Sequence, residues 1–353
     1  MTEALGHASG KVILLGEHAV VYGAPALAAG IERGARARAT LSSGASELWL
    51  GGGERGAAPA EGEVAQAFAA LLEALPGAGP VRVAAESELP PGGGLGSSAA
   101  LGVAIARAVD ALARETSVAT VVAGAAASPA AAGPPAETAL DPASPVLAAA
   151  TAWERVFHGN PSGVDTTAAA RGGCFRFTRA HGATPIVPRD DLWLCVGATG
   201  APSSTRSMVD LVAKLFERKP ALAEGSIAGI AALVENAALA IEAGDAIGLG
   251  RLMDLNQMLL AGMFVSTEAI EALCRLAREA GALGAKLTGA GGGGSVIALL
   301  PPPPPGEGGA APEAADRVLA AWRDAGYSGF VTRVKAGETS VTSVTTRMAE
   351  EQA

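Results

Sequence analysis

The sequence predicts an α+β protein whose two domains meet near residue 190. Strand-like and helix-like segments alternate along the whole chain, and the pattern starts again with a strand just after residue 190. A chain of 353 residues is also long enough for two domains of ordinary size. We therefore expect one domain over residues 1–190 and a second over residues 191–353.

The first domain is expected to open with strands. Apolar runs broken by turn residues predict strand structure over 11–23, and a hairpin or meander over 31–50. A glycine-rich loop over 51–62 leads to a helix predicted over 63–75. The alternating segment 81–89 then predicts another strand, which runs into a second glycine-rich stretch.

A helix over 97–114 is the clearest helical prediction, because Ser97 can cap its start and apolar residues recur every three to four positions. Residues 115–148 are rich in Ala, Pro, Thr and Ser and show no periodicity, so we expect a surface excursion that could serve as a lid. Residues 301–315 should form a loop, since five consecutive prolines exclude a helix and a central strand.

The second domain should mix buried strands with long helices. The sequence predicts strands at 191–200, 295–300 and 329–335, and helices near 203–217, 225–243, 245–261, 266–281 and 312–325.

Charge and cysteine content exclude several classes of protein. The formal net charge is -9 and no run of Lys or Arg occurs, so we expect no nucleic-acid partner. The three cysteines are far apart and form no CxxC pair, which is ordinary in a reducing compartment. With neither a signal segment nor 18 strongly apolar residues in a row, we expect a cytoplasmic protein without a membrane span.

The segment PPGGGLGSSAA, residues 90–100, has the composition of a phosphate-binding loop. Glycines allow the backbone to approach a ligand closely, and a helix starting near Ser97 presents unpaired N–H groups to an anion. One of the hydroxyls of Ser97 and Ser98 could reach a bound Mg²⁺. The loop is not a Walker A motif because it lacks the GK[ST] ending. A plain glycine-rich turn with a serine cap is the structural alternative.

A pair of carboxylates forms the second candidate motif. Glu154 lies in a predicted helix, and Asp165 follows it eleven residues later, across an HGNPSG turn. Mg²⁺ takes one or two carboxylates from protein while it shares phosphate oxygens, and a second carboxylate can accept the proton of an attacking hydroxyl. Alternatively, Glu154 belongs to a solvated helix face and Asp165 is a turn or cap residue.

Two further groups of residues complete the candidate site. The segment KLTGAGGGGS, residues 286–295, could place a backbone wall over a ligand cleft, or simply form an interdomain turn. Near the first strand, Lys11 could stabilise developing phosphoryl charge, while Glu17 and His18 could bind hydroxyl or carbonyl groups of a substrate. Each of these three is otherwise an ordinary strand-end residue.

Together, the order and spacing of KVILLGEHAVVYG, PPGGGLGSSAA, HGNPSGVD and KLTGAGGGG resemble the GHMP kinase superfamily, and within it the mevalonate kinases. The resemblance covers most of the chain, with gaps at 115–148 and 301–315. It implies a two-layer α/β arrangement within the α+β class. The N-terminal domain would be ribosomal-protein-like with a left-handed βαβ crossover, against the usual right-handed rule, and the C-terminal domain ferredoxin-like.

The resemblance also implies a function and its residues. The activity would be transfer of the ATP γ-phosphate to the 5-hydroxyl of mevalonate, with Mg²⁺ as the metal and a homodimer as a conceivable assembly. Asp165 would be the base with Lys11 beside it, and Ser98 and Glu154 would bind Mg²⁺. Mevalonate would be bound by Glu17, His18 and, as a looser match, Thr205. The nucleotide would be bound by Pro91, Gly92, Gly93, Gly94, Leu95, Gly96, Ser97, Ser98 and Gly291.

Other members of the superfamily remain as alternatives. Phosphomevalonate kinase is the first, although no cluster of cations for a substrate phosphate is visible. Galactokinases carry GEHTD-like residues where this chain has GEHAV, and homoserine kinases lack the aspartate of NPSGVD. A non-catalytic nucleotide sensor would not need Lys11, Glu154 and Asp165 together. Arg176 and Arg206 are candidates for binding a substrate carboxylate.

Overall fold

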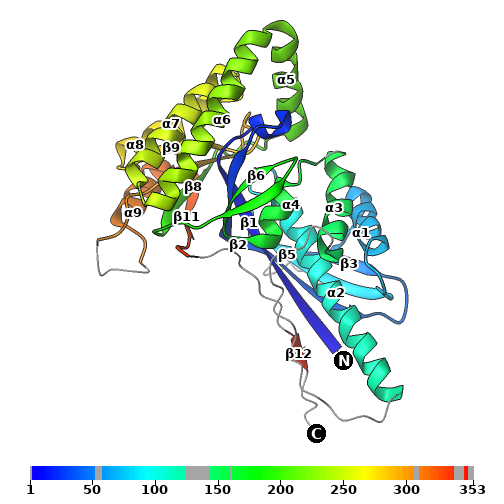
Figure 1. Cartoon of the computed structure of the whole chain (residues 1–353). Helices are drawn as coiled ribbons and strands as arrows, with labels where there is room; N and C mark the ends of the chain where they lie inside the picture. Colours follow the sequence, from blue (N-terminus) through cyan, green and yellow to red (C-terminus); the bar gives the residue numbers. More distant parts are fainter. Residues whose placement is uncertain are drawn as a thin grey trace.

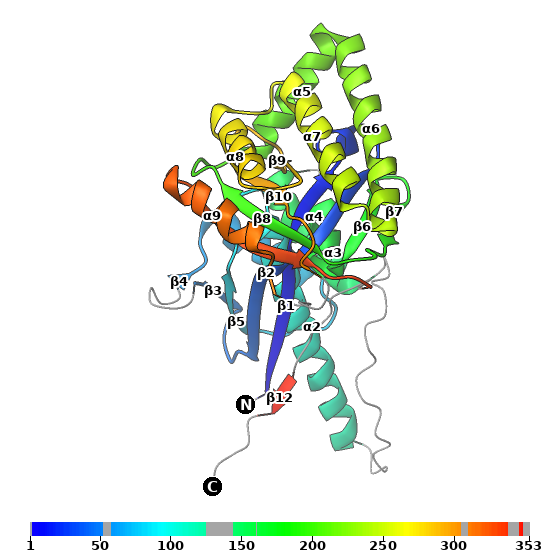
Figure 2. The same cartoon turned by 90° about the vertical axis from the view of Figure 1, so that its left-hand side faces the viewer.

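A computed structural model of the chain describes residues 2–51, 58–124, 144–159, 161–304, 310–337 and 346–348 (Figures 1 and 2). Its strands form two sheets, one of eight strands and one of four. The helices α5 to α8, within residues 205–279, gather at the end of the molecule that lies opposite strand β12 (Thr346–Met348) and the start of β1 at Thr2 (Figures 1 and 2).

The larger sheet is built from the N-terminal part of the chain together with one strand from near its end. Its strands are β1 Thr2–Leu15, β2 Ala26–Leu41, β3 Glu47–Leu50, β4 Ala58–Pro59, β5 Val81–Ser87, β6 Cys174–Thr178, β7 Gly182–Ile186 and β12 Thr346–Met348. The order is β12-β1-β2-β5-β3-β4, with β6 paired to β2 and β7 paired to β6. Among the described strands, only β3 and β5 run parallel, and helix α1 Gly62–Glu73 lies between them in the chain.

Four helices accompany this sheet: α1 Gly62–Glu73, α2 Ser97–Gly124, α3 Pro145–His158 and α4 Val164–Arg171. Helix α2 packs on β1, β2 and β5, and both α1 and α3 pack against α2. Small residues permit this close packing. A Cβ on Gly6 of β1 would lie only 2.1 Å from the Ala104 carbonyl oxygen of α2, so glycine is required there.

The smaller sheet consists of β8 Leu192–Ala198, β9 Gly284–Thr288, β10 Ser295–Leu299 and β11 Ser328–Val334. All its pairs are antiparallel and the order is β11-β8-β10-β9. The remaining helices are α5 Thr205–Arg218, α6 Pro220–Ala243, α7 Ala246–Gly262, α8 Glu268–Glu279 and α9 Glu313–Asp324. Helices precede β9 and β11, which gives the β-α-β-β-α-β sequence of a ferredoxin-like fold. The expected α+β fold class is thereby confirmed.

The two sheets meet at two places. At the first, the Thr288 hydroxyl of β9 accepts from Ile13 N (2.8 Å) and donates to Ile13 O (3.2 Å), beside an irregularity in the β1–β2 pairing. At the second, Arg33 lies over the Phe330 ring with 3.9 Å between its guanidinium carbon and the ring centroid. The main-chain N–H of Glu32 also donates to Thr332 Oγ1 (3.3 Å). Side chains of β9 and β11 thus hold the second sheet against β1 and β2.

Several element boundaries differ from the sequence-based expectation. The predicted excursion over 115–148 was wrong at both ends, because α2 continues to Gly124 and α3 begins at Pro145. Its central part, 125–143, lies outside the described residues, and so does the predicted lid. Strand β1 begins at Thr2 rather than near Lys11. It ends at Leu15, and a 3₁₀ helix, η1 Ala19–Tyr22, follows.

The proposed division at residue 190 stays a prediction. The strands before that point belong to the larger sheet and β8 to β11 belong to the smaller one, but β12 returns to pair with β1 near the end of the chain. The hand of the crossover formed by β3, α1 and β5 also stays a prediction.

Helix α6 is, among the described residues, the one helix long and apolar enough to cross a membrane by composition alone. It packs against α5, α7, η1 and the strands β1 and β2. These contacts are those of a helix within a folded domain.

Candidate active site

The central pair of the site joins β1 to α4. Lys11 Nζ lies 3.1 Å from Asp165 Oδ1, although the two residues are 154 positions apart (165 − 11 = 154). The Lys11 side chain is 3% exposed, whereas that of Asp165, in the first turn of α4, is 40% exposed. The Lys11 main chain also donates to Leu95 O in the glycine-rich segment (2.9 Å). A buried cation therefore faces a carboxylate that solvent and small molecules can reach.

A second contact brings α2 and α3 together. Ser98 Oγ donates to Glu154 Oε1 at 2.5 Å, and Trp153 Nε1 donates to Ser98 O at 3.0 Å. Burial, with a smaller contribution from the negative charge of Asp165, raises the pKa of Glu154 to about 7, while the bond from Ser98 opposes the rise. His158 Nε2 lies 3.7 Å from Glu154 Oε2.

These oxygens suit a small hard cation. Mg²⁺ usually takes one or two carboxylate oxygens from a protein and completes its shell with water and phosphate. Ser98 and Glu154 converge at the start of α2, and a buried carboxylate with a raised pKa gains from a nearby positive charge. The described residues contain no cluster of three or more His, Cys, Asp or Glu side chains able to enclose a metal alone.

The glycine-rich loop before α2 depends on its glycines. Gly92, Gly94 and Gly96 have φ values of 69°, 74° and 73°, in the left-handed region that other residues avoid. A Cβ on Gly96 would also lie 2.9 Å from Lys11 Cγ. The first α-helical bond of α2 runs from Ala100 N to Gly96 O, so the N–H groups of residues 97–99 precede the ladder and are available to an anion.

The two serines that begin α2 have different surroundings. Ser98 Oγ contacts Glu154, as the metal-site prediction requires, whereas Ser97 Oγ lies 3.2 Å from Ser87 Oγ of β5. Of the two hydroxyls, the one on Ser98 is therefore the candidate for a metal.

The second glycine-rich loop, residues 289–294, packs directly on the first. A Cβ on Gly94 would lie 2.9 Å from Thr288 O. Gly291 and its three successors all have positive φ, and Gly291 O accepts a bond from Ser203 Oγ. The loop therefore lies between the phosphate-loop candidate and the turn before α5, which agrees with a wall beside a nucleotide. A contact between Gly291 and the nucleotide stays a prediction.

Glu17 and His18 lie in the turn after β1, and both are buried. The Glu17 carboxylate accepts from Lys286 Nζ of β9 and from Asn256 Nδ2 of α7 (3.2 Å). His18 Nε2 lies 2.8 Å from Ala290 O, and the φ of His18 is 61°, an uncommon value for a residue other than glycine. The fold surrounds the Glu17 carboxylate with protein groups, which does not favour direct contact with a substrate.

The other predicted substrate ligands have no direct contact with the Lys11–Asp165 pair among the described residues. Thr205 is an exposed residue at the start of α5, after the capping Ser204, and no bond recorded among the described residues joins it to Lys11 or Asp165. Arg176 is paired with Glu235 of α6 at 2.6 Å, and Arg206 is exposed. The sequence did not single out Lys286 or Asn256. The available signal was Lys286 itself, a lone lysine in a strand that the sequence marks as buried. A buried cation needs a partner, so such a lysine predicts a buried carboxylate nearby.

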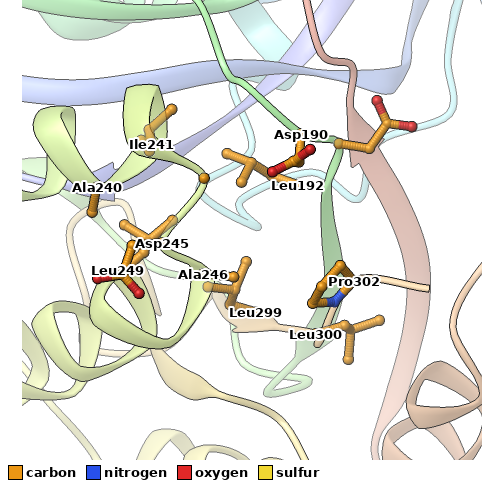
Figure 3. Close-up of a pocket in the computed structure, with 12 residues that line it drawn as sticks. Asp190, Leu192, Ala240, Ile241, Asp245, Ala246, Leu249, Leu299, Leu300 and Pro302 are labelled. Carbon is orange, nitrogen blue, oxygen red and sulfur yellow. The ribbon is translucent and has the colours of Figure 1, made fainter. Parts of the chain in front are cut away.

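A small cavity of about 20 Å³ lies away from these residues, between the end of α6, the start of α7, the start of β8 and the end of β10 (Figure 3). Two of its acidic residues have structural roles. Asp245 accepts from Gly248 N at the start of α7 (2.8 Å), and Asp191 pairs with Arg333 (3.2 Å). It has room for about one water molecule and takes no part in the candidate site.

Comparison with known proteins identifies the family. The model of the GHMP kinases N terminal domain matches residues 63–133, and that of the GHMP kinases C terminal matches residues 237–328. The chain is 38% identical to the mevalonate kinase of Aeropyrum pernix, over 82% of this chain and 86% of that protein. It is 32% identical to the mevalonate kinase of Thermococcus sibiricus, over 94% and 96%.

Solved structures agree with this assignment. The L. major mevalonate kinase in complex with R-mevalonate is 27% identical, covers 95% of this chain and 96% of its own, and superposes with a TM-score of 0.74. The Methanococcus jannaschii mevalonate kinase, at 21% identity, shares the fold with a TM-score of 0.69 over 94% of this chain and 98% of its own. The chain therefore belongs to the mevalonate kinases of the GHMP kinase family.

Proposed function

We propose that this chain transfers the γ-phosphate of ATP to the 5-hydroxyl of mevalonate, with Mg²⁺ as its metal. The observation that carries the proposal is the Lys11–Asp165 ion pair, which lies beside the Ser98–Glu154 contact at the start of α2. The first contact supplies a base and a cation for an alcohol acceptor, and the second supplies oxygen ligands next to a phosphate-binding loop.

On the acceptor side, Asp165 accepts the hydroxyl proton as the new P–O bond forms and the bond between the γ-phosphorus and the oxygen of the leaving ADP breaks. Lys11 holds the Asp165 carboxylate in place, and its charge favours the phosphoryl oxygens that approach it. Because phosphoryl transfer has a loose transition state, catalysis depends mainly on this alignment and on charge neutralisation. Thr205 and His18 stay as proposed acceptor ligands.

On the phosphate side, the N–H groups at the start of α2 and the loop from Pro91 to Ser98 bind the ATP phosphates, with Gly291 in the facing loop. Ser98 and Glu154 would hold Mg²⁺, which supplies positive charge to the phosphate oxygens when bound. Both ligands come from helices, so their spacing is set by the packing of α2 on α3.

We also place the reaction in the cytoplasm, with a small molecule rather than nucleic acid or membrane as the partner. In support, the chain has a net charge of -9, and Cys174, Cys195 and Cys274 are buried and unpaired. Burial raises the pKa of all three thiols to about 12, so none of them is poised to react. The homodimer stays a prediction.

An acceptor panel tests the function. ADP release is measured with mevalonate, phosphomevalonate, homoserine and galactose, each with ATP and Mg²⁺. Mevalonate should give a kcat/KM at least about 100-fold above that of the other three, because a site built for one acceptor loses affinity when polar groups are left unpaired. A preference for phosphomevalonate would contradict the proposal and identify the closest alternative.

A further inference from the structure

The Glu17 carboxylate lies where the end of β1, strand β9 and helix α7 meet. It follows β1 in the chain, and it is bonded to Lys286 of β9 and to Asn256 of α7. The side chains of Glu17 and Lys286 are both fully buried. Lys286 Nζ also donates to Leu287 O (2.6 Å), so these contacts engage both charged groups within the protein.

Each charge of this pair depends on the other. Burial raises the pKa of Glu17 and lowers that of Lys286, while the attraction between the two opposes both shifts. Removal of one partner would leave an uncompensated buried charge, whereas removal of both leaves none. The charge of Lys11 also acts on both groups, so the pair lies within electrostatic reach of the catalytic lysine.

The pair is part of a seam between β9 and the end of β1 with its following turn. Lys286 bonds to Glu17 and Thr288 bonds to the main chain of Ile13; these two residues are two apart on β9, so their side chains share a face of the strand. Just beyond β9, Ala290 O lies 2.8 Å from His18 Nε2. Strand β1, on one side of the seam, carries Lys11. Strand β9, on the other side, leads directly into the second glycine-rich loop after Thr288.

We propose that Glu17 is a positioning residue rather than an acceptor ligand. Held by Lys286 and Asn256, its carboxylate fixes the distance between strand β1, with its catalytic Lys11, and the glycine-rich loop 289–294. The proposal rests on the proposed kinase function for its kinetic test. It assigns to Lys286 and Asn256 roles that depend on the geometry of the seam and not on contact with a substrate.

The test is a double-mutant cycle with Lys286→Met, Glu17→Gln and the double variant. Lys286→Met should lower kcat about 10- to 100-fold, because a displacement of about 1 Å in aligned groups has effects of that size. In the double variant no charge is buried, and the amide oxygen of Glu17→Gln can still accept from Asn256 Nδ2. It should therefore regain kcat to within about threefold of wild type with a similar KM for the acceptor. Arg275→Met, which breaks an exposed pair with Glu279, is the matched control and should leave kcat unchanged.

Two outcomes would overturn the proposal. One is an unchanged kcat in folded Lys286→Met. The other is an acceptor KM raised about tenfold in both Glu17→Gln and the double variant with kcat intact, which would make Glu17 a ligand. If Lys286→Met does not fold, Asn256→Leu removes an uncharged donor to Glu17 and leaves the ion pair in place. This variant should lower kcat without raising the acceptor KM. A raised KM with unchanged kcat would again refute the proposal.

Failure of the function can be separated from failure of the inference. Wild-type protein is first assayed on the acceptor panel, and all variants are then compared on the acceptor that it phosphorylates. An acceptor other than mevalonate would refute the proposed function, while the pattern of rescue in the double variant would still decide the role of Glu17.

Discussion

Glu154, the proposed Mg²⁺ ligand, carries a structural cost. The fold removes its carboxylate from water, and this burial raises its pKa from 4.5 to about 7. Between these values the folded protein binds a proton that the unfolded chain does not. The contribution of Glu154 to stability is therefore complete below pH 4.5 and is lost as the pH rises through 7.

Glu154→Gln should consequently stabilise the metal-free protein at alkaline pH. The gain over wild type should approach about 3 kcal/mol above pH 8 and vanish near pH 4.5, since one pKa unit corresponds to about 1.4 kcal/mol. Urea unfolding of both proteins at several pH values measures the difference. Glu279→Gln, on the exposed side of α8, is the control. A gain that does not vary with pH would contradict the assigned cause.

The same substitution should weaken the use of Mg²⁺. An amide oxygen carries no net charge and is a poorer ligand for a hard cation than a carboxylate. We expect Glu154→Gln to require about tenfold more Mg²⁺ for half-maximal rate, which a titration of activity at saturating ATP would measure. An unchanged Mg²⁺ requirement would remove Glu154 from the metal site.

Prediction of single residues from the sequence had a clear limit. The motifs named Lys11, Asp165, Ser98 and Glu154, and the fold brings these together in two direct contacts. No partner for Glu17 could be predicted, because Lys286 is 269 positions away and only the tertiary structure brings the two together. Glu17 was therefore assigned to the substrate rather than to the protein interior.

At the level of elements, the loop before α2 combines backbone strain with close packing. Alanine at Gly96 would adopt a φ of 73° and place its Cβ 2.9 Å from Lys11 Cγ. Gly182, the first residue of β7, has a similar φ of 68° but open space around it. The two glycines therefore separate the cost of the backbone conformation from the cost of contact with Lys11.

Both Gly96→Ala and Gly182→Ala should lose about 1 kcal/mol of stability from the left-handed conformation. Only Gly96→Ala should also lower kcat, by about tenfold or more, because it displaces Lys11. Thermal unfolding and steady-state kinetics on both variants measure the two effects. Equal kcat values in the two variants would show that the contact with Lys11 is unimportant.

The boundaries of elements were predicted unevenly. Helix α2 was recognised up to residue 114, where its apolar repeat is regular, but it continues to Gly124 through a stretch rich in β-branched residues. The short helix α4, which carries Asp165, was not predicted, since eight residues give little more than two turns of pattern. The hairpin of β6 and β7 was also missed.

At the level of the whole molecule, the seam between the sheets depends on a few polar groups. The Thr288 hydroxyl satisfies both the N–H and the C=O of Ile13, where the β1–β2 pairing is irregular. The sequence could not predict this contact, because 275 positions separate the two residues and neither belongs to a recognisable pair. The return of β12 to β1 was unpredictable for the same reason.

Thr288→Val keeps the shape of the side chain and removes the hydroxyl. The substitution leaves both the N–H and the C=O of Ile13 without this partner. A buried unsatisfied polar group costs about 1 to 3 kcal/mol, so the loss of both bonds should lower the free energy of unfolding by about 2 to 4 kcal/mol. Thr184→Val on the exposed strand β7 is the matched control and should change it by less than about 0.5 kcal/mol. Chemical denaturation measures both, and equal effects would contradict a specific seam.

The central claim joins all three scales: Asp165 serves the acceptor, while separate elements bind the nucleotide. Asp165→Asn tests it most directly, through kcat on mevalonate and ATP affinity measured by calorimetry on the same variant. The account predicts that kcat falls by about 100-fold or more while the Kd for ATP stays within about threefold of wild type. Near-wild-type turnover, with ATP affinity unchanged, would contradict it.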